Sequence, residues 1–137
     1  MRERKSRYLI ALKNSHRNPS TINQTLLKYQ QLTSLLKVKS ITFDNDISFR
    51  NHEELAKAFS AKTYFCDPSK SHQKGSIENA NRTLREYCPR KIDIQSLEQK
   101  QLDEYIKLIN ECPMKRLGYK TPTEVYFKLI VDEIRGY

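Results

Sequence analysis

Short segments rich in β-forming residues alternate with segments of helical periodicity, and this alternation constrains the fold more than any other feature. Residues 40–44 and 62–66 have the composition of strands. Asn51 with Glu54 forms a capping-box pattern for a short helix between them. Residues 7–13 also have the composition of a short strand. Strands that alternate with helices are typical of α/β proteins, so we expect an α/β fold.

Four longer helices complete the expected pattern. In each, apolar residues recur at helical spacing, and residues that favour a helix start stand in front of them. The first helix is expected from Ser20 or Thr21 to Leu36, and the second from Ser76 to the residue before Pro89. The third is capped by Ser96 with Gln99 and includes Ile109. The last begins with Thr121, Pro122 and Glu124 and runs to about Arg135.

The chain is basic, and its excess of positive charge is concentrated near its start. It has 25 Lys and Arg against 16 Asp and Glu, a formal net charge of +9 at pH 7. Residues 1–39 hold nine of the basic residues and a single acid, Glu3, so the rest of the chain is close to neutral. Clusters of Lys and Arg suit contacts to phosphate groups, so nucleic acid is the expected partner. The alternative is a solvated basic surface.

Composition excludes several classes of protein. No apolar run approaches the ~18 residues that cross a membrane, and the apolar residues 8–12 are too few for a secretory signal. Cys66, Cys88 and Cys112 are far apart in the sequence, which is not the spacing of a zinc site. Scattered cysteines fit a reducing compartment, so we expect a cytoplasmic protein without a membrane partner.

Asp44 and Glu78 are the candidate catalytic and metal-binding residues. Asp44 ends an expected strand and Glu78 lies in the first turn of an expected helix, positions that face a shared crevice in α/β folds. Carboxylate oxygens suit Mg²⁺, and paired Mg²⁺ ions support phosphodiester chemistry. Arg82 and Arg85 follow Glu78 at helical spacing, which favours contacts to DNA phosphates. The alternative is structural: a strand-end Asp in a turn, and a first-turn Glu that complements the helix dipole.

Five longer phrases occur in a fixed order along the chain. They are Ser40-Ile-Thr-Phe-Asp-Asn45, Asn51-His-Glu-Glu-Leu-Ala56, Lys62-Thr-Tyr-Phe-Cys-Asp-Pro68, Gln73-Lys-Gly-Ser-Ile-Glu-Asn79, and Arg116-Leu-Gly-Tyr-Lys-Thr-Pro122 with Glu124. In this order and at these intervals, they resemble the catalytic core of insertion-sequence transposases, above all those of the IS-thirty family. The resemblance covers nearly the whole chain.

The resemblance implies an RNase H-like integrase core that acts in DNA cleavage and strand transfer during transposition. In that core an Asp-Asp-Glu triad binds two Mg²⁺ or Mn²⁺ ions; Asp44 matches the second Asp and Glu78 matches the Glu. Transposon ends and target DNA are the implied partners, together with a full-length transposase or a second copy of the chain. The basic residues expected to contact DNA are Lys70, Lys74, Arg82, Arg85, Lys115 and Arg116.

The resemblance also implies that the first triad Asp is missing. Family members carry it on the first strand, upstream of a segment that resembles Glu3-Arg-Lys-Ser-Arg-Tyr8, with which this chain begins. We therefore expect a truncated, C-terminal portion: an incomplete core over about residues 1–92, without the first strand and most of the second, then a helical extension over about 93–137. With two of three ligands, the isolated chain is expected to bind metal poorly and to be inactive. The alternative is a non-catalytic basic chain that binds DNA or associates with a transposase.

Two residues close to Asp44 depart from the family pattern. Family members usually have Gly where this chain has Asp46, and an acidic residue where it has Ser48. Gly permits backbone conformations that are costly for Asp. In the loop of residues 68–75, His72 stands where family members usually have Trp. These departures predict altered positioning of DNA.

Overall fold

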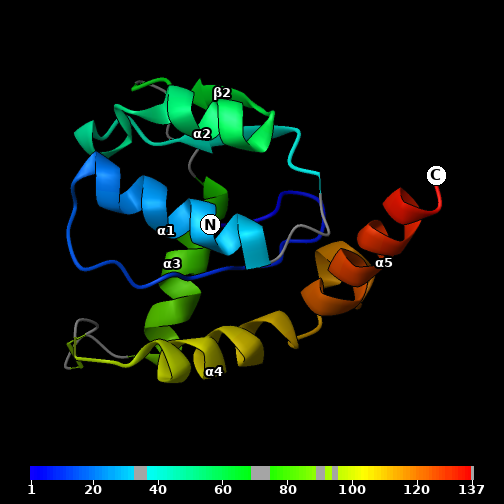
Figure 1. Cartoon of the computed structure of the whole chain (residues 1–137). Helices are drawn as coiled ribbons and strands as arrows, with labels where there is room; N and C mark the ends of the chain where they lie inside the picture. The colour runs from blue at the N-terminus through cyan, green and yellow to red at the C-terminus, as the bar shows by residue number, and fades with distance from the viewer. Residues whose placement is uncertain (33–36, 69–74, 89–91, 94–95, 137) are drawn as a thin grey trace. The chain divides into compact units, whose positions relative to one another are not determined.

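The computed structural model describes residues 1–32, 37–68, 75–88, 92–93 and 96–136. They form two compact units: a strand unit, Asn14–Lys74, and a helical unit, Met1–Lys13 with Gly75–Tyr137. The elements in chain order (Figure 1) are α1 Pro19–Leu32, β1 Ser40–Phe43, η1 Ile47–Phe49, α2 His52–Phe59, β2 Lys62–Phe65, α3 Gly75–Tyr87, α4 Gln99–Asn110, η3 Lys115–Leu117 and α5 Pro122–Ile134.

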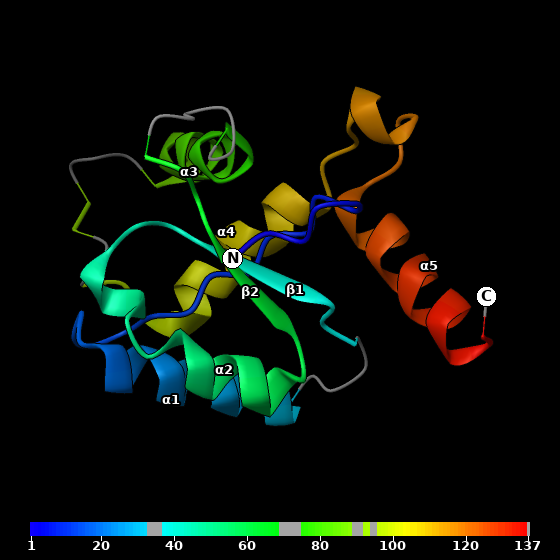
Figure 2. The same cartoon turned by 90° about the horizontal axis from the view of Figure 1, so that it is seen from above.

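The strand unit is built on a parallel pair, β1 and β2, joined through α2. The register runs from Ser40 opposite Lys62 to Phe43 opposite Phe65. Parallel neighbours need a crossover connection, and α2 supplies it. Figure 2 shows α1 and α2 side by side, and the two helices contact each other. Both strands and the helix between them are confirmed as the sequence predicted.

The core of the strand unit fixes the end of β1. Leu55 of α2 is fully buried, and Phe43, the last residue of β1, is 5% exposed. The Phe43 ring lies 4.9 Å from the ring of Phe49 and 5.8 Å from that of Phe65, measured between centroids. These aromatic contacts hold Phe43 inside the unit, so the position where the chain leaves β1 is well defined.

The predicted capping box at the start of α2 is wrong. Asn51 precedes the helix but its side chain caps no backbone N–H. The Glu54 carboxylate instead accepts a hydrogen bond of 2.7 Å from Nδ2 of Asn23, which also donates to the Asn51 carbonyl at 3.0 Å. Asn23 is only 2% exposed, so its amide needs these acceptors. The pairing of α1 with α2 therefore replaces the local cap.

Two other predicted caps are shifted, although their helices are confirmed. Oδ1 of Asn18 accepts from the backbone N–H of Thr21 at 2.8 Å, so Asn18 rather than Ser20 or Thr21 caps α1. The predicted end at Leu36 lies outside the described residues. At the start of α4, Oε1 of Gln101 accepts from the N–H of Glu98 at 2.9 Å. The Glu98–Gln101 pair thus replaces the predicted Ser96–Gln99 pair.

The cap of α5 is the one the sequence predicted. The Thr121 hydroxyl accepts from the Glu124 N–H at 3.1 Å, and the Glu124 carboxylate accepts from the Thr121 N–H at 2.7 Å. Pro122 follows as the first helical residue. This reciprocal pair satisfies backbone donors that a helix start leaves open.

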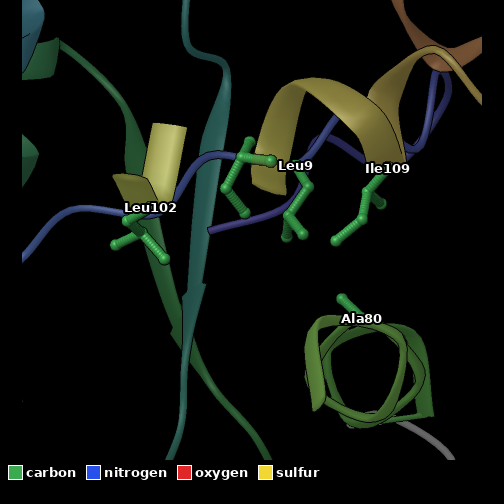
Figure 3. Packing of buried hydrophobic residues seen from close by; sticks show 5 residues of the cluster. Leu9, Ala80, Leu102 and Ile109 are labelled. Carbon is green, nitrogen blue, oxygen red and sulfur yellow. The ribbon is translucent and has the colours of Figure 1, made fainter. Parts of the chain in front are cut away.

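The core of the helical unit joins three segments that are distant in sequence. Leu9 from the N-terminal segment packs with Ala80 of α3 and with α4 (Figure 3). The α4 residues of this cluster are Leu102, Ile106 and Ile109. They recur every three or four residues, so one face of α4 turns to the core. α3 is confirmed by its apolar Ala80 and Leu84, which pack into the same cluster.

The predicted strand at residues 7–13 is wrong. Within the described chain the segment forms only an isolated antiparallel bridge between Arg2 and Leu9. A strand needs a hydrogen-bonded backbone neighbour along its length; here Tyr8 and Ile10 bond the backbone of Glu3 and Met1 on one side, and on the other side Leu9 meets a single side chain. The Leu9 N–H donates to Oδ1 of Asn110 at 2.8 Å, and Nδ2 of Asn110 donates to the Leu9 carbonyl at 2.9 Å.

The expected boundary near residue 92 falls inside the helical unit. A division of the chain into about residues 1–92 and 93–137 stays a prediction. Within the ranges that the structure covers, no helix has the length and apolar character needed to cross a membrane.

Candidate metal and nucleic-acid site

Asp44 lies directly after β1 and is exposed. The residue that follows Asp44 is bonded to the residue that follows β2: Nδ2 of Asn45 donates to the Cys66 carbonyl at 2.8 Å. The Cys66 N–H donates to the Phe43 carbonyl at 2.9 Å, so the parallel pairing continues past the strands. Asp44 therefore occupies the carboxyl edge of the parallel pair, where ligands of α/β folds bind.

Asp46 and Ser48 form one structural pair beside Asp44. The Asp46 carboxylate accepts hydrogen bonds from the Ser48 hydroxyl and, at 2.8 Å, from the Ser48 N–H. These two bonds hold the pKa of the Asp46 carboxyl below its usual value. Asp46 has φ −101° and ψ 142°, an ordinary extended conformation. Asp at this position therefore causes no backbone strain, and its partner Ser48 makes it the cap of η1.

Glu78 lies in the first turn of α3 and is exposed. It lines a shallow depression together with Gly75, Asn79 and Arg82. Nη2 of Arg82 donates to Oδ1 of Asn79 at 2.8 Å, which orients the guanidinium of one residue that lines this depression. Arg85, one turn further on, is exposed as well. Spacings of four and seven residues place both arginines on the same face of α3 as Glu78.

The remaining residues predicted to contact DNA either belong to η3 or lie outside the described residues. Lys115 and Arg116 are exposed in η3, and they belong to the same helical unit as α3. Lys70, Lys74 and His72 lie outside the described residues. Asp44 belongs to the strand unit and Glu78 to the helical unit, and each is placed within its own unit.

A complete set of metal ligands is not found among the described residues. No three His, Cys, Asp or Glu side chains gather there as a group that could hold an ion. The shared role of Asp44 and Glu78 as metal ligands stays a prediction.

Sequence reasoning missed the position of the first arginines. Nη1 of Arg2 donates to the Ser76 carbonyl at 2.7 Å, and Nη1 of Arg7 donates to the Ser76 hydroxyl at 3.1 Å. Ser76 is in the first turn of α3, so part of the basic N-terminal segment lies on the helix that carries Glu78. The charge run signalled a function for this segment, but no pattern in the sequence pointed to Ser76.

Comparison with known proteins identifies the family. Transposase InsI for insertion sequence element IS30C of Escherichia coli (strain K12) is 37% identical over 124 residues, which are 90% of this chain and 32% of the relative. The transposase for insertion sequence element IS4351 of Bacteroides fragilis is 40% identical over 104 residues, which are 73% of this chain and 32% of the relative. The chain belongs to the IS30 family of transposases.

This IS30-family chain spans about a third of the length of the curated relatives it matches. A putative integrase of Spiroplasma virus SpV1-R8A2 B is also similar, with 30% identity over 94 residues, 69% of this chain and 29% of the relative. No protein-family model matches the chain.

The fold has a solved counterpart. The catalytic core domain of BIV integrase superposes with a TM-score of 0.73 at 20% identity, over 97% of this chain and 86% of that domain. The IS30-family chain therefore has the fold of an integrase catalytic core. This confirms the RNase H-like α/β fold expected from the sequence.

Proposed function

We propose that the chain is part of the catalytic core of an IS30-family transposase and contributes Asp44 and Glu78 to metal-dependent DNA cleavage and strand transfer. The observation that carries this proposal is the location of the two carboxylates. Asp44 stands at the carboxyl end of β1 and Glu78 in the first turn of α3, in a chain related to transposases. Both are exposed, as residues that reach a DNA substrate must be.

The donor atoms of these residues fit Mg²⁺ or Mn²⁺. Magnesium prefers oxygen ligands and usually takes one or two protein carboxylates together with phosphate oxygens. When bound, a pair of such ions activates the attacking oxygen and stabilises the leaving oxygen of a phosphodiester. The chain's own part is to hold the ions through Asp44 and Glu78.

Basic residues on the helical unit would hold the DNA. Arg82 lies in the same depression as Glu78, and Arg85 is on the same face of α3. Lys115 and Arg116 add exposed positive charge from η3. Guanidinium groups bind phosphate oxygens through paired N–H donors, which favours Arg82 and Arg85 as backbone contacts. Lys70 and Lys74 are assigned the same role on the basis of sequence.

We expect no cleavage or strand transfer by the isolated chain, because two carboxylates make an incomplete triad. The test is a nicking assay on supercoiled plasmid DNA with Mg²⁺ or Mn²⁺. The expected result is no nicked product for the wild-type chain. Metal-dependent nicking that disappears in both Asp44→Ala and Glu78→Ala would overturn the expected inactivity while supporting the two residues as metal ligands.

Weak metal binding can be tested without activity. In NMR spectra, Mn²⁺ should broaden the amide signals of Asn45 and Asn79, which adjoin the two carboxylates. If both carboxylates hold the same metal centre, Glu78→Gln should also reduce the broadening at Asn45. Glu104→Gln, which removes an exposed carboxylate of α4, should change neither signal. Broadening that Glu78→Gln leaves unchanged at Asn45 would contradict a shared centre.

A second candidate function is a non-catalytic chain that binds DNA or associates with a full-length transposase. The exposed arginines of α3 favour it, since phosphate attraction needs no metal. DNA binding with the same affinity in the presence of EDTA and of Mg²⁺, together with unbroadened signals at Asn45 and Asn79, would favour this second function over the first.

A further inference from the structure

Two arginines of the N-terminal segment are bound to the first turn of α3, and a third arginine acts on one of them electrostatically. Arg2 and Arg7 both bind Ser76, through its carbonyl and its hydroxyl respectively. Nε of Arg2 also donates to the Arg7 carbonyl at 3.1 Å, which keeps the two residues together. Arg116 of η3 acts electrostatically on Arg2 from the same unit. We call Arg2, Arg7 and Arg116 the arginine cluster.

The cluster is a concentration of like charge. Partial burial lowers the pKa of the Arg2 guanidinium, and the charges of Arg7 and Arg116 lower it further. In the described part of the chain, no carboxylate is paired with any of the three. Glu3, the acid nearest to Arg2 and Arg7 in sequence, accepts hydrogen bonds from the N–H groups of Lys5 and Ser6 instead. An anion bound at the cluster would relieve this repulsion.

The hydrogen bonds within the cluster leave many donors for a ligand. A guanidinium carries about five N–H donors in a planar fork that matches phosphate. Among the bonds within the described residues, Arg7 uses only its Nη1 and Arg116 uses none. Two guanidinium groups that are held near a helix start, without carboxylate partners, have the chemistry of a phosphate site rather than of a structural ion pair.

We propose that Arg2, Arg7 and Arg116 bind a phosphate group of a nucleic-acid backbone at the first turn of α3. This inference rests on the proposed function and adds a second point of DNA contact to it. Residues two apart on a helix point to nearly opposite sides, since each residue turns the helix by about 100°. A nucleic-acid strand whose phosphate is bound on the Ser76 side would therefore leave the opposite face of α3, with Glu78 and Arg82, accessible to the reacting DNA.

The test compares Arg7→Gln and Arg116→Gln, which each remove one charge of the arginine cluster, with two matched control variants of the full chain. The dissociation constant for a fluorescein-labelled DNA duplex is measured by anisotropy over a series of NaCl concentrations. Ser76→Ala removes the hydrogen bond of Arg7 but keeps its charge. Arg135→Gln removes one exposed charge at the end of α5, so it controls for net charge. Thermal unfolding of each variant confirms that the chain is folded.

We expect Arg7→Gln and Arg116→Gln each to reduce the slope of log Kd against log salt by about 0.9, and to weaken binding about eight-fold near ~0.1 M salt. Ser76→Ala and Arg135→Gln should keep the wild-type slope. An equal effect of Arg135→Gln would overturn the inference, because it would show attraction to net charge alone. Unchanged binding in Arg7→Gln and Arg116→Gln would overturn it as well.

Two further results separate this inference from the proposed function. If inorganic phosphate raises the melting temperature of the wild-type chain but not of Arg7→Gln, while the substitutions leave DNA binding unchanged, the cluster binds a small anion and the inference is wrong for nucleic acid. If Arg82→Gln weakens DNA binding and Arg7→Gln does not, the proposed function stands and the arginine cluster fails. A wild-type chain that binds no DNA at all would contradict both.

Discussion

The Asn110 carboxamide bonds both backbone groups of Leu9, its N–H at 2.8 Å and its carbonyl at 2.9 Å. Asn110 is 2% exposed and Leu9 is 5% exposed. In a β-sheet, the backbone of a neighbouring strand would bond these two groups. Here one side chain at the end of α4 makes both hydrogen bonds instead. The contact ties two parts of the helical unit that are 101 residues apart in sequence.

Asn110→Ala should therefore be strongly destabilising. It leaves a buried N–H and a buried carbonyl without partners, each of which costs about 1–3 kcal/mol. We expect the free energy of unfolding to fall by about 2–4 kcal/mol, measured by urea denaturation and circular dichroism. Leu108→Ala, at an exposed position of the same helix, should change it by about 0.5 kcal/mol or less. Equal losses for the two variants would refute the special role of Asn110.

Glu3 should make the stability of the chain sensitive to acid. Burial raises the pKa of its carboxyl, but hydrogen bonds from the Ser6 hydroxyl at 2.5 Å and from the N–H groups of Ser6 and Lys5 outweigh this effect. The net pKa is lower in the folded state than in the unfolded chain. Such a group stabilises the fold above its unfolded pKa of ~4.3, and the contribution is lost as the pH falls through the folded pKa.

Glu3→Gln should lower the melting temperature at neutral pH and flatten its decline below about pH 4.3. The measurement is a series of thermal melts from neutral to acid pH. Glu86→Gln removes an exposed carboxylate of α3 and should retain the wild-type pH profile. A Glu3→Gln chain with the same acid-induced loss as the wild type would show that other groups cause it.

Gly118 and Gly75 should respond in opposite ways to alanine. Gly118 has φ +64° and Gly75 has no positive φ, while nothing within 4 Å would meet a Cβ at either position. Only the backbone conformation therefore distinguishes them. Gly118→Ala should cost about 1 kcal/mol because the left-handed conformation is unfavourable for alanine. Gly75→Ala, at the start of α3, should be neutral or stabilising by up to about 1 kcal/mol.

The elements that were predictable from the sequence are those fixed by local chemistry. The start of α5 follows from Thr121, Pro122 and Glu124, because all three act within one turn. β1 and β2 follow from their own residues and the helix between them. Asp44 was placed correctly at the end of β1 for the same reason. The elements predicted an α/β fold but not which one. The RNase H-like core was predicted from the resemblance to a known family.

The errors arose where a distant residue replaced a local partner. Residues 7–13 have strand composition, but Asn110 satisfies Leu9 from the end of α4. Glu54 could cap its own helix, yet it binds Asn23 of α1. The arginines at Ser76 belong to the same class, since nothing in the spacing of Arg2 and Arg7 reveals their partner. Long-range hydrogen bonds of this kind cannot be read from periodicity or caps.

The Asn79–Arg82 pair allows a test of the face of α3 that we propose binds DNA. Arg82→Gln should reduce the slope of log Kd against log salt for a DNA duplex by about 0.9, because one phosphate contact is lost. Asn79→Ala removes the acceptor that orients Arg82 but keeps its charge. It should weaken binding at every salt concentration while leaving the slope unchanged. Anisotropy titrations distinguish the two effects, and a reduced slope in Asn79→Ala would mean that Arg82 loses its phosphate contact when it loses its orientation.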